Sequence, residues 1–290
     1  MNVLYIIDRY CIIYMCLREH KNKIDKCVKR NKFMKTVRPE TKKELKNLIL
    51  ETIKNEGNEC DLSFIDTSLI TDMSFLFQNM PDFNGKISDW DVSKVTDMHC
   101  MFNYARTFNQ PLDKWNVSNV KDMSGMFCRA DSFNQPLDSW NVSNVTNMRY
   151  MFYHAVSFNQ PINSWNVSNV TDMGEMFSYA ESFNQPLNSW NVSNVYNMAH
   201  MFSLAASFNQ PLENWDVSNV EDMDSMFFKA KSFNQPLDKW NVSNVGDMYC
   251  MFFNAESFNQ QLDTWQIREY IDLEDVFTGT KLKSLPQWMK

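Results

Sequence analysis

A column of carboxylate and amide side chains is the feature of this sequence that comes closest to a reactive site. It recurs in steps of 25 residues and consists of Asp72, Asp97, Asp122, Asn147, Asp172, Asn197, Asp222, Asp247 and Asp272. If the units stack at ~5 Å, the spacing of β-strands, such a ladder would bind cations or titrate as coupled acids. Asn, however, occupies two of the nine positions and caps a helix as well as Asp does. We therefore interpret the column as helix N-terminal residues and expect no metal.

Other reactive groups are not arranged for catalysis. The histidines fall at different positions of the repeat, unlike metal ligands or a catalytic pair; they are His20, His99, His154 and His200. The many serines have no histidine and acid in a recognisable arrangement, and the six glycines form no phosphate-binding loop. We therefore expect a non-enzymatic protein without a cofactor.

The Asn-Val-Ser sequences and the cysteines do not indicate a modification site or a disulfide framework. Five Asn-Val-Ser sequences match the glycosylation sequon, at Asn116, Asn141, Asn166, Asn191 and Asn241. Glycans ~5 Å apart could not all fit on a packed ladder, so we attribute the sequons to the repeat. The cysteines, which have no paired spacing, are predicted to be free thiols: Cys11, Cys16, Cys27, Cys60, Cys100, Cys128 and Cys250.

The charge is unevenly distributed along the chain. Residues 1–50 hold 13 Lys and Arg against 5 Asp and Glu, a net +8, whereas residues 51–290 hold 15 against 30, a net −15. The acidic repeats argue against nucleic acid as a partner.

The domain organisation begins with a basic segment, residues 1–37. Its first 17 residues are apolar, but Asp8 and Arg9 interrupt the run, which is shorter than the ~20 residues of a membrane span. A mis-annotated start before Met34, a disordered arm, a folded helix and a membrane signal all remain open, and membrane association is uncertain.

Residues 38–64 are predicted to form a capping helix and leader. Thr41 and Glu44 have the spacing of a capping box. One helical face carries apolar side chains and Gly57 suits a helix stop; the face consists of Leu45, Leu48, Ile49, Thr52 and Ile53. We expect this helix to cover the end of the repeats.

Residues 65–277 repeat with a period of 25 without an insertion, and residues 278–290 form a C-terminal cap. The period is marked by Trp90, Trp115, Trp140, Trp165, Trp190, Trp215, Trp240 and Trp265. Leu112, Trp115 and Val117 predict a very short strand, and Val120 to Ala130 a short helix. This predicts an α/β repeat protein, an LRR-like right-handed solenoid with one short parallel strand and one short helix per turn. We expect the Trp, Phe and Met columns to form its core.

The repeat L-x-x-W-x-V-S-N-V-x-D-M-x-x-M-F-x-x-A-x-x-F-N-Q-P resembles that of the BspA-type leucine-rich-repeat surface proteins of bacteria, some protists and large viruses. The resemblance covers residues 65–277. It implies an LRR-like solenoid and, in several members, attachment to host proteins or cells. It also implies a cell-surface location, although no signal peptide or anchor is evident; a cytoplasmic location is the alternative.

Variable positions carry the candidate binding site. Aromatic side chains, which are enriched at protein interfaces, recur at positions predicted to be exposed on the helices. The candidate protein-binding residues are Tyr104, Tyr150, His154, Tyr179, Tyr196 and His200. We predict a protein-recognition or adhesion module with a protein or cell-surface partner and no small-molecule substrate. The alternative is an intracellular scaffold or assembly protein.

Overall fold

The computed structural model describes residues 36–269 and 271–289. The chain divides into two compact units, Met1–Val37 and Arg38–Lys290, and the second is described below. The alternatives for residues 1–33 lie outside the described residues. In the described part, no helix is long and apolar enough to cross a membrane.

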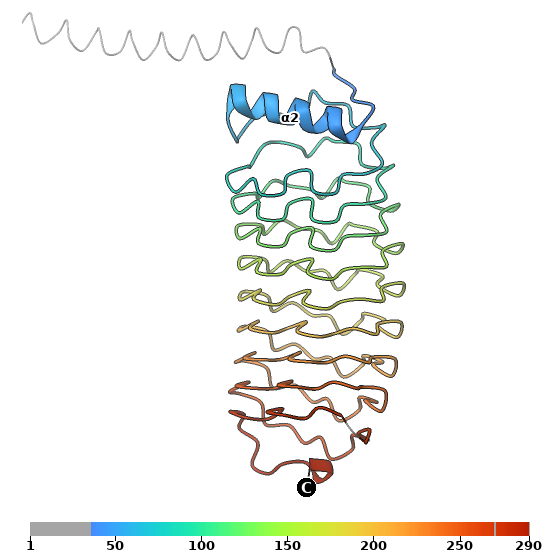
Figure 1. Ribbon diagram of the computed structural model, residues 1–290, viewed down its shortest axis with the longest axis vertical. Coiled ribbons are helices and arrows are strands. Elements are labelled where there is room, and N and C mark those ends of the chain that lie inside the picture. The colour runs from blue at the N-terminus through green and yellow to red at the C-terminus, as the bar shows by residue number, and fades with distance from the viewer. Residues whose placement is uncertain (1–35, 270, 290) are drawn as a thin grey trace, which may run out of the picture. The chain divides into compact units, whose positions relative to one another are not determined.

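The repeats form a stack with little regular secondary structure (Figure 1). The helical elements of the described residues are α-helix α2, Lys42–Glu56, and 3-10 helix η1, Gln287–Met289. Successive repeats are joined by single parallel β-bridges in the aspartate column, from Asp72–Asp97 through to Asp247–Asp272. The strand predicted at Leu112, Trp115 and Val117 is not formed, and the bridges lie instead in the segment predicted to be helical.

The predicted helix in each repeat is wrong, because the backbone amides bond between repeats. The amides of Met123, Gly125, Phe127 and Arg129 donate to carbonyls one repeat further on, at 2.7–3.1 Å. The amides between them close turns, as when Met126 donates to the Met123 carbonyl at 3.1 Å. An α-helix requires amides to donate to the carbonyl four residues earlier. A succession of turns therefore replaces the helix, and it points nearly every third residue inward.

Helix α2 begins and ends as its sequence predicts. Thr41 Oγ1 accepts from the Glu44 amide at 3.2 Å, and the Glu44 carboxylate accepts from the Thr41 amide at 3.3 Å, which completes the capping box. Gly57 ends the helix with φ 89° and ψ 178°. This is not the left-handed helical stop that we expected, but it is a conformation open almost only to glycine.

Helix α2 lies across the first turn of the stack (Figure 1). Leu45 and Ile49 are fully buried in the same apolar core as the repeats. Lys46 Nζ donates to the carbonyl of Leu76 in that turn. The helix therefore covers apolar side chains and backbone groups that a preceding repeat would otherwise cover.

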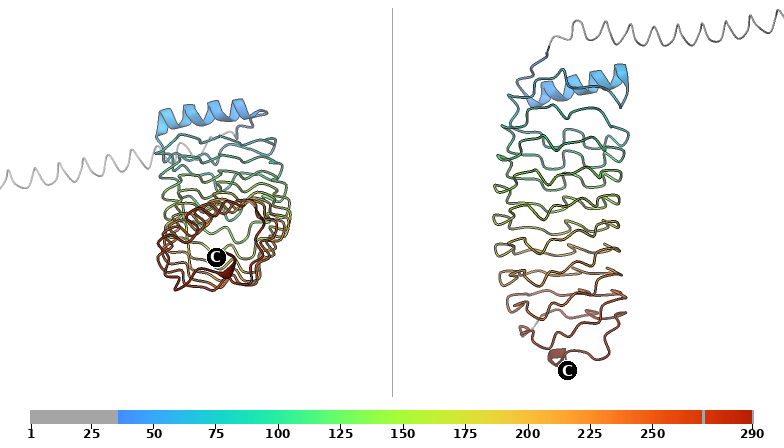
Figure 2. Two further views of the ribbon diagram at one scale, coloured as in Figure 1. Left: turned by 60° about the horizontal axis from the view of Figure 1, so that its bottom comes forward. Right: turned by 180° about the vertical axis from the view of Figure 1, so that it is seen from behind.

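Apolar columns fill the interior, as predicted for the Trp, Phe and Met positions. Each column tryptophan from Trp90 to Trp265 is at most 3% exposed. Phenylalanines from Phe77 to Phe277 stack between repeats with ring centroids 5.4–5.7 Å apart. Viewed obliquely along the stack, successive turns follow one outline (Figure 2). Burying such a side chain contributes about 1.5–3 kcal/mol, so this regular interior dominates stability.

Polar ladders align one turn with the next. Asn134 Oδ1 accepts from the Asn159 amide at 3.0 Å and from the Gln160 side chain at 3.0 Å, and this pattern recurs along the Phe-Asn-Gln segments. On another side, Trp140 Nε1 donates to the Leu112 carbonyl at 2.9 Å. These bonds satisfy groups that stacking removes from water, so they fix the register of 25 residues.

The C-terminal residues continue part of the pattern. Trp288 stacks on Trp265 with centroids 6.1 Å apart, and its Nε1 donates to the Leu262 carbonyl at 2.8 Å. The Lys281 amide donates to the Phe258 carbonyl at 2.9 Å. Residues 281–289 therefore cover one side of the last turn.

Candidate functional site

Two columns of variable side chains lie at left-handed backbone positions. Their sixteen non-glycine members have φ between 52° and 63°. The first column is Phe75, Cys100, Gly125, Tyr150, Glu175, His200, Ser225, Cys250 and Asp275. The second is Asn79, Tyr104, Arg129, His154, Tyr179, Leu204, Lys229, Asn254 and Gly279. We call these two columns the variable face.

The turns impose this conformation on any side chain. The Ala105 amide donates to the Phe102 carbonyl at 2.9 Å, so Tyr104 is the third residue of a turn, where type II turns require a positive φ. A non-glycine residue there costs about 1–2 kcal/mol. The Tyr104 amide gains a 2.8 Å bond to the Cys128 carbonyl in the next repeat. Because the core and this bond hold the backbone, the outward side chain can differ between repeats.

A basic side chain, that of Arg129, links aromatic rings of the repeats on either side of its own. The Arg129 guanidinium carbon lies 4.9 Å from the ring centroid of Tyr104 and 5.7 Å from that of Tyr153. Arg106 lies 5.5 Å from the Tyr104 ring and 3.8 Å from the Asp131 carboxylate. These cation–π contacts hold the rings without burying them completely.

Further rings continue this group. Tyr153 contacts Tyr150 and Tyr179 at 5.8 and 5.7 Å in edge-to-face geometry, and His154 stacks on Tyr179 at 5.7 Å. Burial raises the pKa of the Tyr150 and Tyr153 phenols, and a hydrogen bond with Glu175 raises that of Tyr150 further. Both phenols are therefore uncharged at neutral pH. We define the aromatic cluster as Tyr104, Arg129, Tyr150, Tyr153, His154 and Tyr179.

A pocket of about 230 Å³ adjoins the aromatic cluster. It is lined by Tyr153, Glu175, Ser178, Tyr179, His200, Ser203, Leu204, Ser225 and Phe228. The volume is below the usual ~300–1,000 Å³ of small-molecule sites. It is large enough for one side chain of a partner.

An ionisable pair lies at the pocket. His200 Nε2 is 3.1 Å from Asp224 Oδ2, and Ser225 Oγ donates to Asp224 Oδ1 at 2.7 Å. The hydrogen bond with Asp224 raises the pKa of His200. Burial opposes ionisation of Asp224, but hydrogen bonds from His200 and Ser225 hold its pKa below the ordinary value. The serine bonds to the carboxylate and not to the imidazole, which is not the order of a nucleophilic triad.

The structure groups five of the six candidate residues. Tyr150, His154 and Tyr179 belong to the aromatic cluster, Tyr104 joins it through Arg129, and His200 lines the adjacent pocket. Tyr196 belongs to a different column. It is 47% exposed and, within the described part of the chain, contacts no other aromatic ring.

Sequence reasoning missed residues that connect the cluster. Tyr153 lies at its centre, and Arg129 and Arg149 each stack on a ring. The column of Tyr153 holds Cys128 and Ser178 in the two adjacent repeats, and its other aromatic residues are Phe228 and Phe253. An aromatic ring next to two small residues of its column was a signal of an exposed contact residue.

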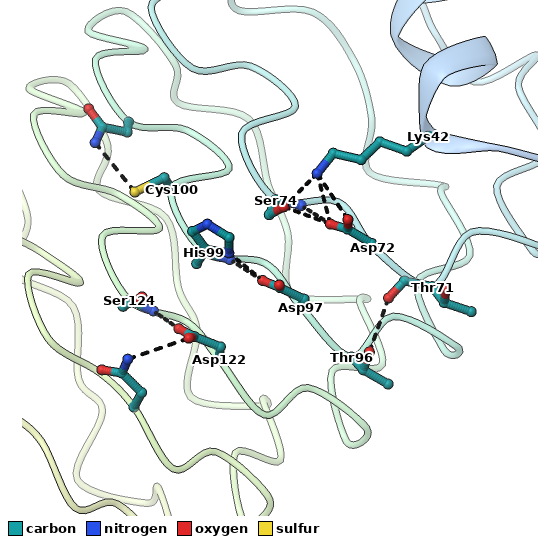
Figure 3. A network of polar contacts seen from close by, with 12 residues as sticks. Lys42, Thr71, Asp72, Ser74, Thr96, Asp97, His99, Cys100, Asp122 and Ser124 are labelled. Atoms are coloured by element: carbon teal, nitrogen blue, oxygen red, sulfur yellow. Dashed lines mark hydrogen bonds and ion pairs between the residues drawn. The ribbon is translucent and has the colours of Figure 1, made fainter.

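The side chains of the aspartate column form turns (Figure 3). Asp97 Oδ1 accepts from the His99 amide at 3.0 Å and Asp122 Oδ1 from the Ser124 amide at 2.8 Å, as Asn147 does from Arg149 at 3.0 Å. The expected helix caps are thus turn-forming side chains, a role that Asp and Asn share. Among residues 36–269 and 271–289, no three His, Cys, Asp or Glu residues are grouped as metal ligands. The cysteines Cys100, Cys128 and Cys250 are free thiols, as predicted.

Comparison with known proteins identifies a family. A comparison with curated proteins gave no match. One family model, described as "Mycoplasma protein of unknown function, DUF285", matches residues 44–155, 137–218 and 190–288. These overlapping segments cover α2 and the repeats, and they agree with a chain built from repeated units. The chain therefore belongs to the DUF285 family.

Proposed function

We propose that this protein is a non-enzymatic recognition module that binds a protein partner through the aromatic cluster. The observation that carries the proposal is the continuous contact of rings and guanidinium groups over neighbouring repeats, from Tyr104 through Arg129 and Tyr153 to Tyr179. Tyr and Arg are the residue types enriched in the central contacts of protein interfaces.

The scaffold favours this role because it holds the side chains in place before binding. The variable face is tied to neighbouring repeats by backbone bonds such as Tyr179 N to Ser203 O at 2.8 Å. Binding therefore orders few groups, which lowers its entropic cost. A partner side chain inserted into the adjacent pocket would meet Glu175 and the faces of Tyr179 and Phe228.

Resemblance to the BspA-type proteins supports a finer version of this proposal. In that version the stack is an LRR-like right-handed solenoid and serves as an adhesin at the cell surface. Parallel bridges at every repeat support the solenoid. An intracellular scaffold would use the same cluster. Protease shaving of intact cells distinguishes the two, since only a displayed adhesin is removed.

Two substitutions test the binding site. Tyr153→Ala and Tyr179→Ala remove rings from the cluster. Tyr196→Ala removes a more exposed ring outside it, since Tyr196 is 47% exposed and Tyr179 36%. A partner is first captured from host extract and purified, and its affinity for each variant is then measured. We expect the two cluster variants to bind at least about 30-fold more weakly, the effect of an interface hot spot, with thermal stability retained.

The control decides the location of the site. Tyr196→Ala should bind as the unsubstituted protein does. If all three variants bind equally, the aromatic cluster is not the binding site. If Tyr196→Ala alone loses binding, the binding site lies on the column of Tyr196, outside the aromatic cluster.

A further inference from the structure

Alternate peptide groups on the variable face point the same way along the stack. In residues 122–129, the carbonyls of Asp122, Ser124, Met126 and Cys128 accept from the preceding repeat at 2.8–3.0 Å. The alternating amides, those of Met123, Gly125, Phe127 and Arg129, donate to the following repeat. Every repeat thus presents a row of acceptors on one side and a row of donors on the other. The aligned dipoles add up along the stack as they do in a helix.

Helix α2 covers one carbonyl of the acceptor row of the first turn and pairs with a side chain beside it. The Leu76 carbonyl accepts from Lys46 of α2, and Lys42 Nζ lies 2.9 Å from Asp72 Oδ1 (Figure 3). Lysines thus lie at the end of the stack that carries unpaired carbonyls. The same charge preference applies at a helix C-terminus.

The donor row of the last turn is uncovered. In the described part of the chain, the amides of Leu273, Asp275, Phe277 and Gly279 have no acceptor. Residues 281–289 cover the other side of this turn, where Lys281 and Trp288 bond to the preceding repeat. An unpaired row of this kind is an open sheet edge.

The side chains beside the donor row are acidic. Asp272, Glu274 and Asp275 are all exposed. Asp272 accepts from the Glu274 amide at 3.0 Å and Asp275 from the Thr278 hydroxyl at 2.8 Å. Anionic acceptors would be repelled from this edge. Main-chain carbonyls carry no such charge and match the spacing of alternating amides.

We propose that this donor edge binds an extended segment rich in Lys and Arg from a partner protein. The segment adds one more parallel row: its carbonyls accept from Leu273, Asp275, Phe277 and Gly279, and its basic side chains pair with the three carboxylates. Edge addition of this kind is a general mode of peptide recognition. A second copy of this chain is disfavoured, because the whole chain carries a net charge of −7 and two copies therefore repel each other.

Amide exchange followed by NMR tests the proposal on the full chain. The probe is a synthetic peptide of alternating Lys and Val, and its control is the same peptide with Glu in place of Lys. We expect the Lys peptide to slow exchange of these amides about tenfold or more while the interior amide of Phe227 is unchanged. Equal protection by both peptides, or none by either, overturns the proposal.

Charge-reversal variants give a second readout. Glu274→Lys should weaken binding of the Lys peptide about fivefold or more. Asp138→Lys makes the same change at an exposed position in the middle of the stack, and should weaken it less. Equal effects would mean that the peptide responds only to net charge. Light scattering is the last control: concentration-dependent self-association with protection of the same amides would make a second copy the occupant and overturn the proposal.

Discussion

At the scale of residues, each repeat has inward positions whose residue type is nearly constant and outward positions whose residue type varies. Inward positions such as Phe127 are fully buried against the same residue type in both neighbouring repeats. Outward positions of the variable face only have to tolerate a positive φ. Side chains as different as Glu175, His200 and Leu204 do so. The residues that we propose for binding therefore lie where the fold constrains the side chain least.

The left-handed positions store strain that glycine would relieve. Lys229 has φ 54°, and Lys229→Gly should stabilise the protein by about 0.5–1 kcal/mol after the entropic cost of glycine is subtracted. Lys231→Gly is the matched control, because Lys231 is exposed and does not have a positive φ. It should destabilise by about 0.5–1 kcal/mol. Urea unfolding measures both; destabilisation by Lys229→Gly would contradict the strain argument.

The His200–Asp224 pair predicts a pH-dependent stability. The pKa of His200 is raised above its ordinary 6.5, so its contribution is full below about pH 6.5 and is lost as the pH rises through the folded-state pKa. The pKa of Asp224 is lowered from 3.8, so its contribution is present above that pH and is lost on acidification. The pair therefore stabilises most between these two values.

Asp224→Asn tests this window. The variant should lose more thermal stability relative to the unsubstituted protein near pH 6 than near pH 9, because His200 is charged only at the lower value. NMR titration of the His200 ring should give a lower pKa in Asp224→Asn. An unchanged His200 pKa would mean that the Asp224 carboxylate does not raise the pKa of His200.

At the scale of elements, the described part of the chain combines the α-helix α2 with many turns. Helix α2 was predictable because its capping box and apolar face are local signals, carried by Thr41, Glu44, Leu45 and Ile49. The turns of the repeat carry no comparable local signal. Their amides are satisfied by the adjacent repeat, which a local periodicity cannot reveal. A three-residue spacing of apolar side chains was therefore mistaken for a helical one.

The cap of α2 can be tested apart from its packing. Thr41→Ala removes the side-chain oxygen that accepts from the Glu44 amide and should cost about 1 kcal/mol of stability. Lys43→Ala, at an exposed position of the first helical turn, should change stability by less than about 0.5 kcal/mol. Chemical denaturation compares the two variants. Equal effects would show that the cap contributes nothing beyond helix propensity.

At the scale of the whole molecule, the sequence predicted the architecture better than the site. The 25-residue period placed Trp140 on Trp165, with ring centroids 6.4 Å apart, because identical units can bury their faces only against each other. The period also identified the variable columns. It could not place Tyr153 against Tyr179 or separate Tyr196 from them. Those relations depend on how turns orient side chains in three dimensions.

A stack held together by neighbouring repeats should tolerate removal of one complete repeat. Deleting residues 134–158 joins Phe133 to Asn159 and preserves every column, as deleting residues 234–258 does by joining Phe233 to Asn259. Both variants should unfold cooperatively with native-like circular dichroism. Deleting only residues 134–145 shifts the columns out of register and should prevent folding.

The two complete deletions differ in the residues that they remove. Deletion of 134–158 takes away Tyr150, Tyr153 and His154, whereas deletion of 234–258 leaves the aromatic cluster intact. Partner capture should therefore be lost in the first variant and kept in the second, at similar thermal stability. If both variants capture the partner equally well, recognition does not depend on the aromatic cluster. If both fail although folded, recognition needs the full length of the stack, because contacts would then be spread over many repeats.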